Sequence, residues 1–109
     1  MIIISYPPQS TGGDSSTGNI SSITTDTTLT SSYYMVLCNA SSNSITITLP
    51  AASNNNRRIY NIKKTDSTGN SITIDGNASE TIDGTLTKSL NLQYESLTII
   101  CDGSNWHIM

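Results

Sequence analysis

The residues of this chain that could support catalysis are four acids, Asp75, Glu80, Asp83 and Asp102. Two carboxyl groups on opposite sides of a sugar linkage can cleave a glycosidic bond, one of them acting as general acid. Three of the four acids, however, open an Asp-Gly pair, where a carboxylate ordinarily hydrogen-bonds the backbone of a turn. The pattern therefore favours turns, and we predict that the chain is not an enzyme.

Metal chemistry has little support in the sequence. His107 is the only histidine, and no cysteine stands at metal-ligand spacing from it. It follows the only tryptophan, Trp106, so a place at the edge of a core or of an interface fits it better. Calcium at the oxygen-rich loop of residues 75–77 is the alternative, but the charge density there is low. We predict no metal and no cofactor.

Aromatic side chains offer a second kind of site, because their faces suit sugar rings. A glycan-binding surface would use five of them, namely Tyr33, Tyr34, Tyr60, Tyr94 and Trp106. The competing role for the same residues is to fill a core, since the chain contains no phenylalanine. We favour the core, and glycan binding remains the alternative.

A short motif recurs at steps of 27 residues and would position these side chains. Residues 43–48 read NSITIT, residues 70–75 read NSITID, and residues 97–102 read LTIICD. Apolar β-branched residues at every second position place alternate side chains on opposite faces of a sheet. A fixed period of this kind is typical of stacked or packed strand units.

The fold class predicted from this pattern is all-β, with short strands that are either antiparallel, as in a sandwich, or β-helix-like. The period fixes the spacing of strands but not their pairing, so both arrangements stay open. Asp-Gly pairs between the apolar runs are strong hairpin signals. Strands are expected at Tyr33–Cys38, Ser44–Leu49, Ile59–Lys64, Ser71–Asp75, Leu90–Gln93, Ser96–Cys101 and Trp106–Ile108, with a weaker one at Glu80–Ile82.

The chain divides into two parts at about residue 32. Residues 1–32 are rich in Pro, Gly, Ser and Thr and are predicted to form an extended N-terminal arm, whereas residues 33–109 form the β domain. The arm is expected to gain order by binding a partner, and a free tail is the alternative. Its apolar triplet could add to a neighbouring sheet as an edge strand. The expected contact residues are Ile2, Ile3, Ile4, Tyr6, Pro7 and Pro8.

Charge and composition exclude several partners. The net charge is -3 and only 12% of the residues are charged, so the chain lacks the clustered cations that bind a nucleic-acid backbone. The four basic residues that do cluster, Arg57, Arg58, Lys63 and Lys64, flank a predicted strand and fit edge charges that discourage unwanted pairing. The apolar run at residues 1–4 is too short for a membrane span or a secretory signal. We expect no nucleic acid and no membrane as partner.

Two further features concern the interior and assembly. Cys38 and Cys101 lie in apolar strand-like runs and are predicted to be free, buried thiols, with a disulfide between them as the alternative. Apolar residues are few for the length of chain to be ordered. Uncharged strand faces carrying Thr46, Thr48, Thr73 and Thr98 could pack against identical subunits. Together these features predict a closed, symmetric oligomer that also hides sheet edges.

An ordered series of phrases covers most of residues 33–109. It comprises RIYNIKKTD (58–66), ITIDG (72–76), ETIDG (80–84), YESLTI (94–99) and DGSNWHI (102–108). The series resembles a β module that recurs in tailed-bacteriophage virion proteins, often at the C-terminal end of fibre-like chains. This resemblance implies a non-enzymatic, surface-exposed β module, commonly trimeric, that is built into phage particles.

The family usually carries a long shaft before the module, and this chain has none. The resemblance therefore implies a homotrimeric capsid decoration, cement or head-fibre protein that the N-terminal arm anchors. Its partner would be the major capsid protein or a tail protein of the same particle. It would be assembled in the host bacterial cytoplasm and displayed on the virion surface. The alternative is a short tail fibre or receptor-binding module that recognises host-surface glycan.

Overall fold

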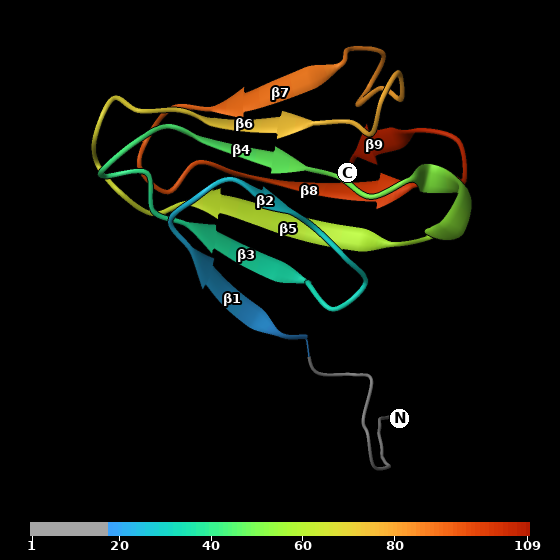
Figure 1. The fold of residues 1–109 in the computed structure, drawn as a ribbon, viewed down its shortest axis with the longest axis horizontal. Helices are drawn as coiled ribbons and strands as arrows, with labels where there is room; N and C mark the ends of the chain where they lie inside the picture. The colour runs from blue at the N-terminus through green and yellow to red at the C-terminus, as the bar shows by residue number, and fades with distance from the viewer. Residues whose placement is uncertain (1–17) are drawn as a thin grey trace, which may run out of the picture.

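The computed structural model describes residues 18–109, which form two β-sheets packed face to face (Figure 1). This range contains nine strands, one 3-10 turn at Ala52–Asn54 and no α-helix, so the all-β prediction is confirmed. The strands are β1 (Ile20–Ile23), β2 (Thr27–Thr28), β3 (Met35–Cys38), β4 (Ile45–Thr48), β5 (Ile59–Lys64), β6 (Ile72–Asp75), β7 (Thr87–Leu90), β8 (Ser96–Cys101) and β9 (Trp106–Ile108).

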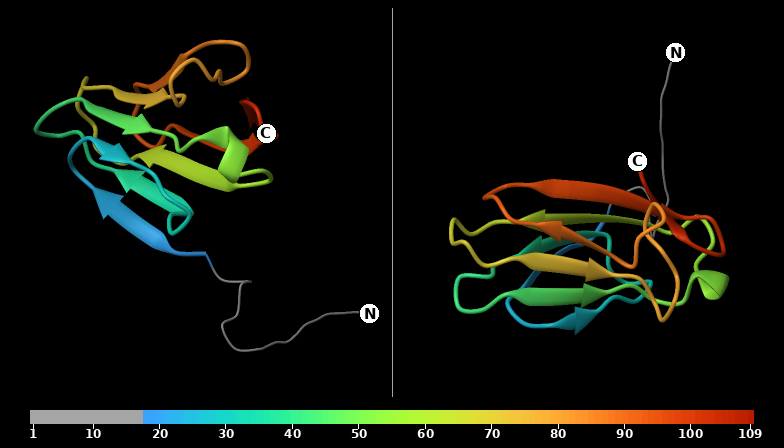
Figure 2. Two further views of the ribbon diagram at one scale, coloured as in Figure 1. Left: turned by 45° about the vertical axis from the view of Figure 1, so that its right-hand side comes forward. Right: turned by 90° about the horizontal axis from the view of Figure 1, so that it is seen from above.

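The first six strands alternate between the two sheets, as in the rungs of a β-helix. The five-stranded sheet has the order β1-β3-β5-β8-β9, and the four-stranded sheet has the order β2-β4-β6-β7. Pairing is parallel from β1 to β3 to β5 and from β2 to β4 to β6. In the right-hand view of Figure 2, β2, β4 and β6 lie side by side and point the same way.

The last three strands close the fold in the antiparallel sense. β7 pairs with β6, β8 pairs with β5, and β9 pairs with β8. A parallel neighbour needs a long crossover, whereas an antiparallel neighbour can follow through a short connection. The structure thus combines the two arrangements that the sequence left open, with stacked rungs first and antiparallel strands at the end.

For two of the three motif copies, a step of 27 residues leads from a residue on one strand to its partner on the neighbouring strand. Ile45 pairs with Ile72 and Ile47 pairs with Ile74, so equivalent residues of β4 and β6 lie side by side in one sheet. The third copy lies in the other sheet, where Leu97 pairs with Ile62 in the antiparallel sense. It shares the alternation of the motif but is not a third rung.

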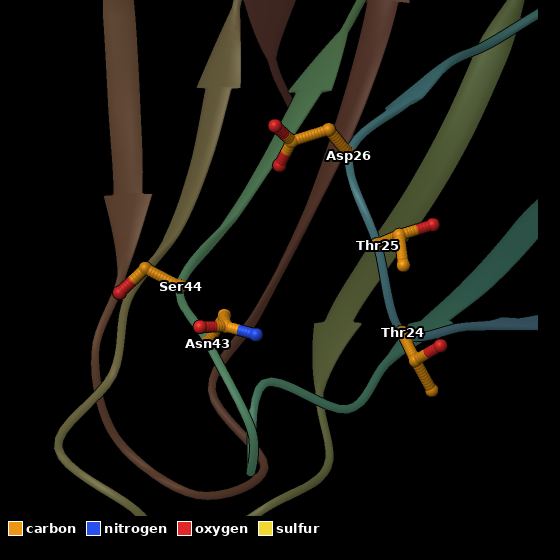
Figure 3. Close-up of a pocket in the computed structure, with 5 residues that line it drawn as sticks. All are labelled: Thr24, Thr25, Asp26, Asn43 and Ser44. Carbon is orange, nitrogen blue, oxygen red and sulfur yellow. The ribbon is translucent and has the colours of Figure 1, made fainter.

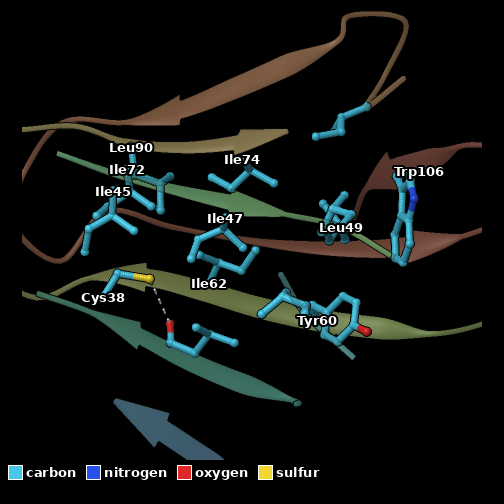
Figure 4. Packing of buried hydrophobic residues seen from close by; sticks show 14 of the residues in the cluster. Cys38, Ile45, Ile47, Leu49, Tyr60, Ile62, Ile72, Ile74, Leu90 and Trp106 are labelled. Carbon is cyan, nitrogen blue, oxygen red and sulfur yellow. Dashed lines mark hydrogen bonds between the residues drawn. The ribbon is translucent and has the colours of Figure 1, made fainter. Parts of the chain in front are cut away.

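The core lies between the two sheets and is built from the inward residues of this alternation (Figure 4). Tyr60 and Trp106 stack at one end of it, with ring centroids 5.6 Å apart and an interplanar angle of 25°. Both rings are fully buried, so they take the place that phenylalanine has in other cores. The fully buried isoleucines are Ile45, Ile47, Ile62, Ile72, Ile74, Ile82 and Ile99.

A buried ion pair fixes the turn after β5. The Lys64 side chain is fully buried, and its Nζ donates to Asp66 Oδ2 at 2.6 Å and to the Thr68 carbonyl at 3.0 Å. Asp66 also accepts the Ala40 amide at 2.7 Å, which joins this turn to the one that follows β3. Because both charges keep several partners, their burial is tolerated. Lys64 is therefore part of the interior and not an edge charge as predicted, whereas the neighbouring residue Lys63 faces outward.

The two cysteines are free and buried. They belong to β3 and β8, which lie on either side of β5. Cys38 pairs with Lys64 at one end of β5, whereas the Cys101 amide donates to the Arg58 carbonyl at the other end. The disulfide alternative therefore does not apply. Burial raises the pKa of the Cys38 thiol to about 12, which keeps it protonated and unreactive.

The sheets begin earlier than the sequence predicted. Residues 20–28, which were assigned to the arm, form β1 and β2 and pair with β3 and β4. Serine and threonine dominate this stretch, but Ile23 packs against the core and Leu29 is buried. A few apolar residues are therefore enough to form a strand where an existing sheet edge is available for pairing. The six predicted contact residues of the arm, Ile2 to Ile4, Tyr6, Pro7 and Pro8, lie outside the described residues.

Strands β3, β4 and β6 are one or two residues shorter than predicted, and two other segments differ more. The strand expected at Leu90–Gln93 is β7 at Thr87–Leu90, because the Glu95 carboxylate accepts the amides of Asn91 and Leu92 and folds that segment into a turn. The weaker strand expected at Glu80–Ile82 is reduced to isolated bridges at Ile82. Strands β5, β8 and β9 have the predicted bounds.

The stacked isoleucines should carry much of the stability. We predict that Ile74→Ala lowers the free energy of unfolding by about 2 to 5 kcal/mol, because it leaves a cavity against Ile47. Thr73→Ala, one position away on the outer face, should cost no more than about 1 kcal/mol. Urea unfolding followed by Trp106 fluorescence measures both, and equal losses would contradict the assignment of the two faces.

Candidate functional site

The four acids that could have been catalytic are mostly engaged in holding the backbone. Asp83 and Gly84 have φ angles of 49° and 85° and form the tight turn of the Ile82–Thr85 bridge. Both Glu80 carboxylate oxygens accept the Ala52 amide at 3.1 Å. Asp75 ends β6 and is paired with Thr87. These positions have the character of turn and strand-end residues.

Asp83 and Asp102 nevertheless meet around one side chain. His107 Nε2 lies 2.7 Å from Asp102 Oδ2, and its Nδ1 lies 3.7 Å from Asp83 Oδ1. Asp83 also accepts the Ile108 amide at 3.1 Å, and Asp102 accepts the amides of Ser104 and Asn105 at 2.8 Å. The cluster thus ties β9 to the two Asp-Gly turns. Backbone hydrogen bonding, with help from His107, lowers the pKa of Asp102 to about 2.

The five aromatic residues are not brought together on one surface. Tyr60 and Trp106 stack inside the core, and Tyr33 packs against it, so their faces are unavailable to a sugar ring. The ring of Tyr34 lies so close to Gly18 that a Cβ there would collide with it. Two of the five are exposed, Tyr34 with 44% and Tyr94 with 61% of its surface.

Tyr94 occupies a strained turn. Its φ is 65°, in the left-handed region that bulky residues seldom adopt. The surrounding bonds over-determine this conformation, because its amide donates to the Lys64 carbonyl at 2.7 Å and the Lys64 amide donates to the Glu95 carbonyl at 3.0 Å. Lys63 Nζ lies 5.3 Å from the ring centroid, so the cation covers one face of the ring.

A polar pocket of about 240 Å³ opens where the β1–β2 and β3–β4 turns meet (Figure 3). Asp26 is already engaged, because its Oδ1 accepts the Thr46 amide at 2.8 Å. Thr24 and Thr25 point away from Asp26 and Ser44, so the polar groups do not converge on one point. Its lining residues are Thr24, Thr25, Asp26, Asn43 and Ser44.

The most distinctive surface is the outer face of the five-stranded sheet. Each strand of that sheet alternates, so the residues between the core positions point outward. Register places Ile59 beside Ile100, and Ile20 beside Met35. We call this surface the apolar face. Its apolar members are Ile20, Met35, Leu37, Ile59 and Ile100.

Several polar groups on the apolar face have partners within the chain. Asn61 and Thr98 sit at its centre and pair with each other, the Thr98 hydroxyl donating to Asn61 Oδ1 at 2.8 Å. Lys63 lies toward one end beneath the Tyr94 ring, and His107 lies beside Ile100 at the other end. The face therefore mixes apolar contact area with polar side chains, which also include Ser22 beside Leu37 and Ser96 beside Lys63.

The outer face of the four-stranded sheet is different in kind. It carries hydroxyl side chains and one acid, as expected of a sheet face in water. Thr46, Thr48 and Thr73 lie there as the alternation predicts, whereas Thr98 belongs to the apolar face. Its outward residues are Thr28, Thr46, Thr48, Thr73, Asp75, Thr87 and Ser89.

Comparison with known proteins assigns no family to the chain. No protein-family model matches it, and no curated protein matches it. Between residues 18 and 109 there is no helix long and apolar enough to cross a membrane. In the same range, no three His, Cys, Asp or Glu side chains are grouped so that they could hold a metal ion.

Sequence reasoning missed the apolar face. A signal was present in the runs MVLC of β3 and LTIIC of β8, which do not alternate cleanly between apolar and polar residues. Continuous apolar runs are typical of strands that are covered on both faces. These two runs could have indicated that the five-stranded sheet needs a second cover.

The hydrogen-bonded carboxylates predict that the stability of the fold depends on pH. Burial alone would raise the pKa of Asp66, but hydrogen bonds from Lys64, Thr68 and the Ala40 amide outweigh it and hold that pKa below its usual range. For Asp66 and Asp102 alike, the stabilisation is complete above the unfolded pKa near 4 and is lost as the pH falls through the folded value, about 2 for Asp102.

We therefore predict that the free energy of unfolding falls between pH 5 and about pH 2, measured by urea unfolding across that range. Asp102→Asn should reduce the slope, because it removes one of the contributing carboxylates, which also include Asp66 and Glu95. Thr73→Ala, on the outer face of β6, removes no titratable group, serves as the control and should leave the slope unchanged. A wild-type stability that is constant down to pH 2 would contradict the assignment.

Proposed function

We propose that this chain is a non-enzymatic structural subunit of a bacteriophage particle, a homotrimeric capsid decoration, cement or head-fibre protein. The observation that carries the proposal is the contrast between the two outer faces. One carries the half-buried apolar side chains Met35, Leu37, Ile59 and Ile100, which a partner would cover, and the other carries threonine and serine and suits water. Self-assembly would provide that cover and is consistent with the trimeric state that the sequence resemblance implies.

The use of the acidic side chains supports a structural role. Asp26, Glu80 and Glu95 each accept a backbone amide from another segment or turn. Asp66 is paired with a buried lysine, and Asp102 caps its own turn. Side chains committed in this way hold connections between strands in place and are poorly available as acids or bases for a substrate.

The N-terminal arm is proposed as the anchor on the particle. The described part of the chain enters the sheet at β1, which is the edge strand of the five-stranded sheet. Residues 1–17 precede it and include the apolar triplet and the two prolines. The proposed partner of this segment is the major capsid protein, or a tail protein, of the same particle.

One observation favours the alternative function of receptor binding. Tyr94 is exposed and held in a strained conformation, and such residues cluster at binding sites. Leu92 in the same turn is 70% exposed. A tail-fibre module that holds host-surface glycan would use the open side of the Tyr94 ring.

Deleting residues 1–17 should abolish attachment to the particle and leave both sheets intact, because β1 begins at Ile20. The measurement is co-sedimentation with capsids of the phage that carries the gene, prepared without this protein. Tyr94→Ala is the matched variant and should still attach. Retention on host cells that Tyr94→Ala abolishes, together with no binding to capsids by the full chain, would contradict the proposal and support the receptor-binding alternative.

A further inference from the structure

We infer that residues 3–11 bind the open edges of β1 and β2 in their own chain and add one further rung to the stack. A rung here is one strand in each sheet together with the turn that joins them, and β1 and β2 form the first rung. The inference goes beyond the proposed anchor, because it concerns the free subunit and requires no particle. The anchor would then be an ordered end of the stack and not a free tail.

The outer edges of β1 and β2 are open at the same end of the stack. Each of the two strands is the end strand of its sheet, and Figure 2 shows β2 in this position in the right-hand view. On its other side, β1 is paired with β3, and the carbonyls of Asn19 and Ile23 accept amides from that side at 2.9 Å. Alternate residues of a parallel strand bond to the same neighbour. The backbone groups of Ile20 and Ser22 therefore point to the open side.

The edges at the opposite end of the two sheets are covered or carry a charge. Along β9, the amides of Trp106 and Ile108 donate to oxygen atoms of residues 81–83. Along β7, Lys88 lies on the inner face, and an inward-pointing charge on an edge strand discourages pairing with another chain. Residues 18–25 contain neither a charged residue nor a proline. The edge of β1 therefore has no such protection and can accept a further strand.

The core is incompletely covered at this end. Ser21, Ile23 and Thr27 are the inward residues of the first rung, and all three are only half-buried. Their partners in the next rung are fully buried and are Val36, Cys38 and Ile47. Because protein interiors are close-packed, a rung on the open side would cover the inward side chains of β1 and β2 as these strands cover those of β3 and β4.

Residues 3–11 repeat the pattern of the first rung at a step of 17 residues. They read IISYPPQST, whereas residues 20–28 read ISSITTDTT, and the two segments are identical at the positions of Ile3, Ser5 and Thr11. A step of 17 lies within the range of the structure, since β1 pairs with residues 15 positions further on and β2 with residues 20 positions further on. The length and the pattern of this segment therefore fit one more rung.

This register places each kind of residue where its chemistry fits. Ile4 and Tyr6 would lie beside Ser21 and Ile23 on the inner face, where apolar side chains extend the core. The two prolines at positions 7–8 would lie in the turn between the two strands of the rung, where no amide is needed for pairing. The rung would therefore combine an apolar inner face with a turn that tolerates proline.

The connection to β1 is long enough for the segment to reach the edges of its own chain. Residues 12–19 would lead back from the four-stranded sheet to β1, and they number eight. The same return from β2 to β3 is made by the six residues 29–34. A segment joined by a short connection has a high effective concentration at its site. The chain's own segment is therefore favoured over that of another copy.

The test measures amide hydrogen exchange at Ile20 and Ser22 in the free, full-length subunit by NMR. Ile4→Lys places a charge on the inner face of the proposed rung, and Ile3→Lys places the same charge on its outer face as the matched control. We expect both amides to exchange at least about tenfold more slowly in the wild type and in Ile3→Lys than in Ile4→Lys. The Met35 amide donates to the residue before β1 and should stay equally protected in all three, which shows that β1 is still paired.

Exchange at Ile20 and Ser22 that is as fast in the wild type as in Ile4→Lys would overturn the inference, even in a chain that attaches to capsids. Slow exchange in a wild-type chain that fails to attach would support the rung and contradict the anchor. Loss of protection in Ile3→Lys but not in Ile4→Lys would contradict the register.

A mixing experiment identifies the chain that supplies the segment. Isotope-labelled Ile4→Lys is mixed with unlabelled wild type, and exchange is followed at Ile20 and Ser22 of the labelled chain. We expect no protection, because each wild-type segment occupies the edges of its own chain. Protection of the labelled chain would show that residues 3–11 come from another copy and would overturn the inference.

Discussion

The structure depends on the stacking of isoleucines at equivalent positions of neighbouring parallel strands. Ile45 lies against Ile72 and Ile47 against Ile74, so each inward side chain finds a matching one on the next strand. Because side chains alternate along a strand, a slip of one residue would turn all of them outward. The 27-residue step in the sequence therefore sets the register of β4 against β6, and the five-stranded sheet packs against the inward side chains of these two strands.

The two ends of the core between the sheets need side chains that fill them or hold the turns there in place. A buried ion pair does this at one end and two aromatic rings do it at the other. The Lys64–Asp66 pair joins two turns at one end of the core, and the stacked Tyr60 and Trp106 fill the other end. The antiparallel strands β7, β8 and β9 then complete both sheets. Completion makes the two outer faces unequal, because β8 brings Ile100 to one of them while β7 brings Thr87 and Ser89 to the other.

Much of this fold can be predicted from the sequence, since alternation and Asp-Gly turns act locally. The bounds of β5, β8 and β9 and the turn at Asp83 follow from such signals. The pairing does not, because the third motif copy has the same local pattern as the other two and yet lies antiparallel in the other sheet. Strand β1, with its sequence ISSI, is stabilised by an existing sheet edge and is not visible in its own run of residues. The apolar face left a signal only in the runs of β3 and β8, and its extent depends on the register of the strands.

The most direct test of the account is the pairing of strands in solution, measured by nuclear Overhauser contacts in the labelled protein. The account predicts parallel contacts that join Ile47 of β4 to Ile74 of β6, together with an antiparallel contact between Asn61 and Thr98. Contacts that place residues 45–48 antiparallel to residues 72–75, or in a different sheet, would contradict it.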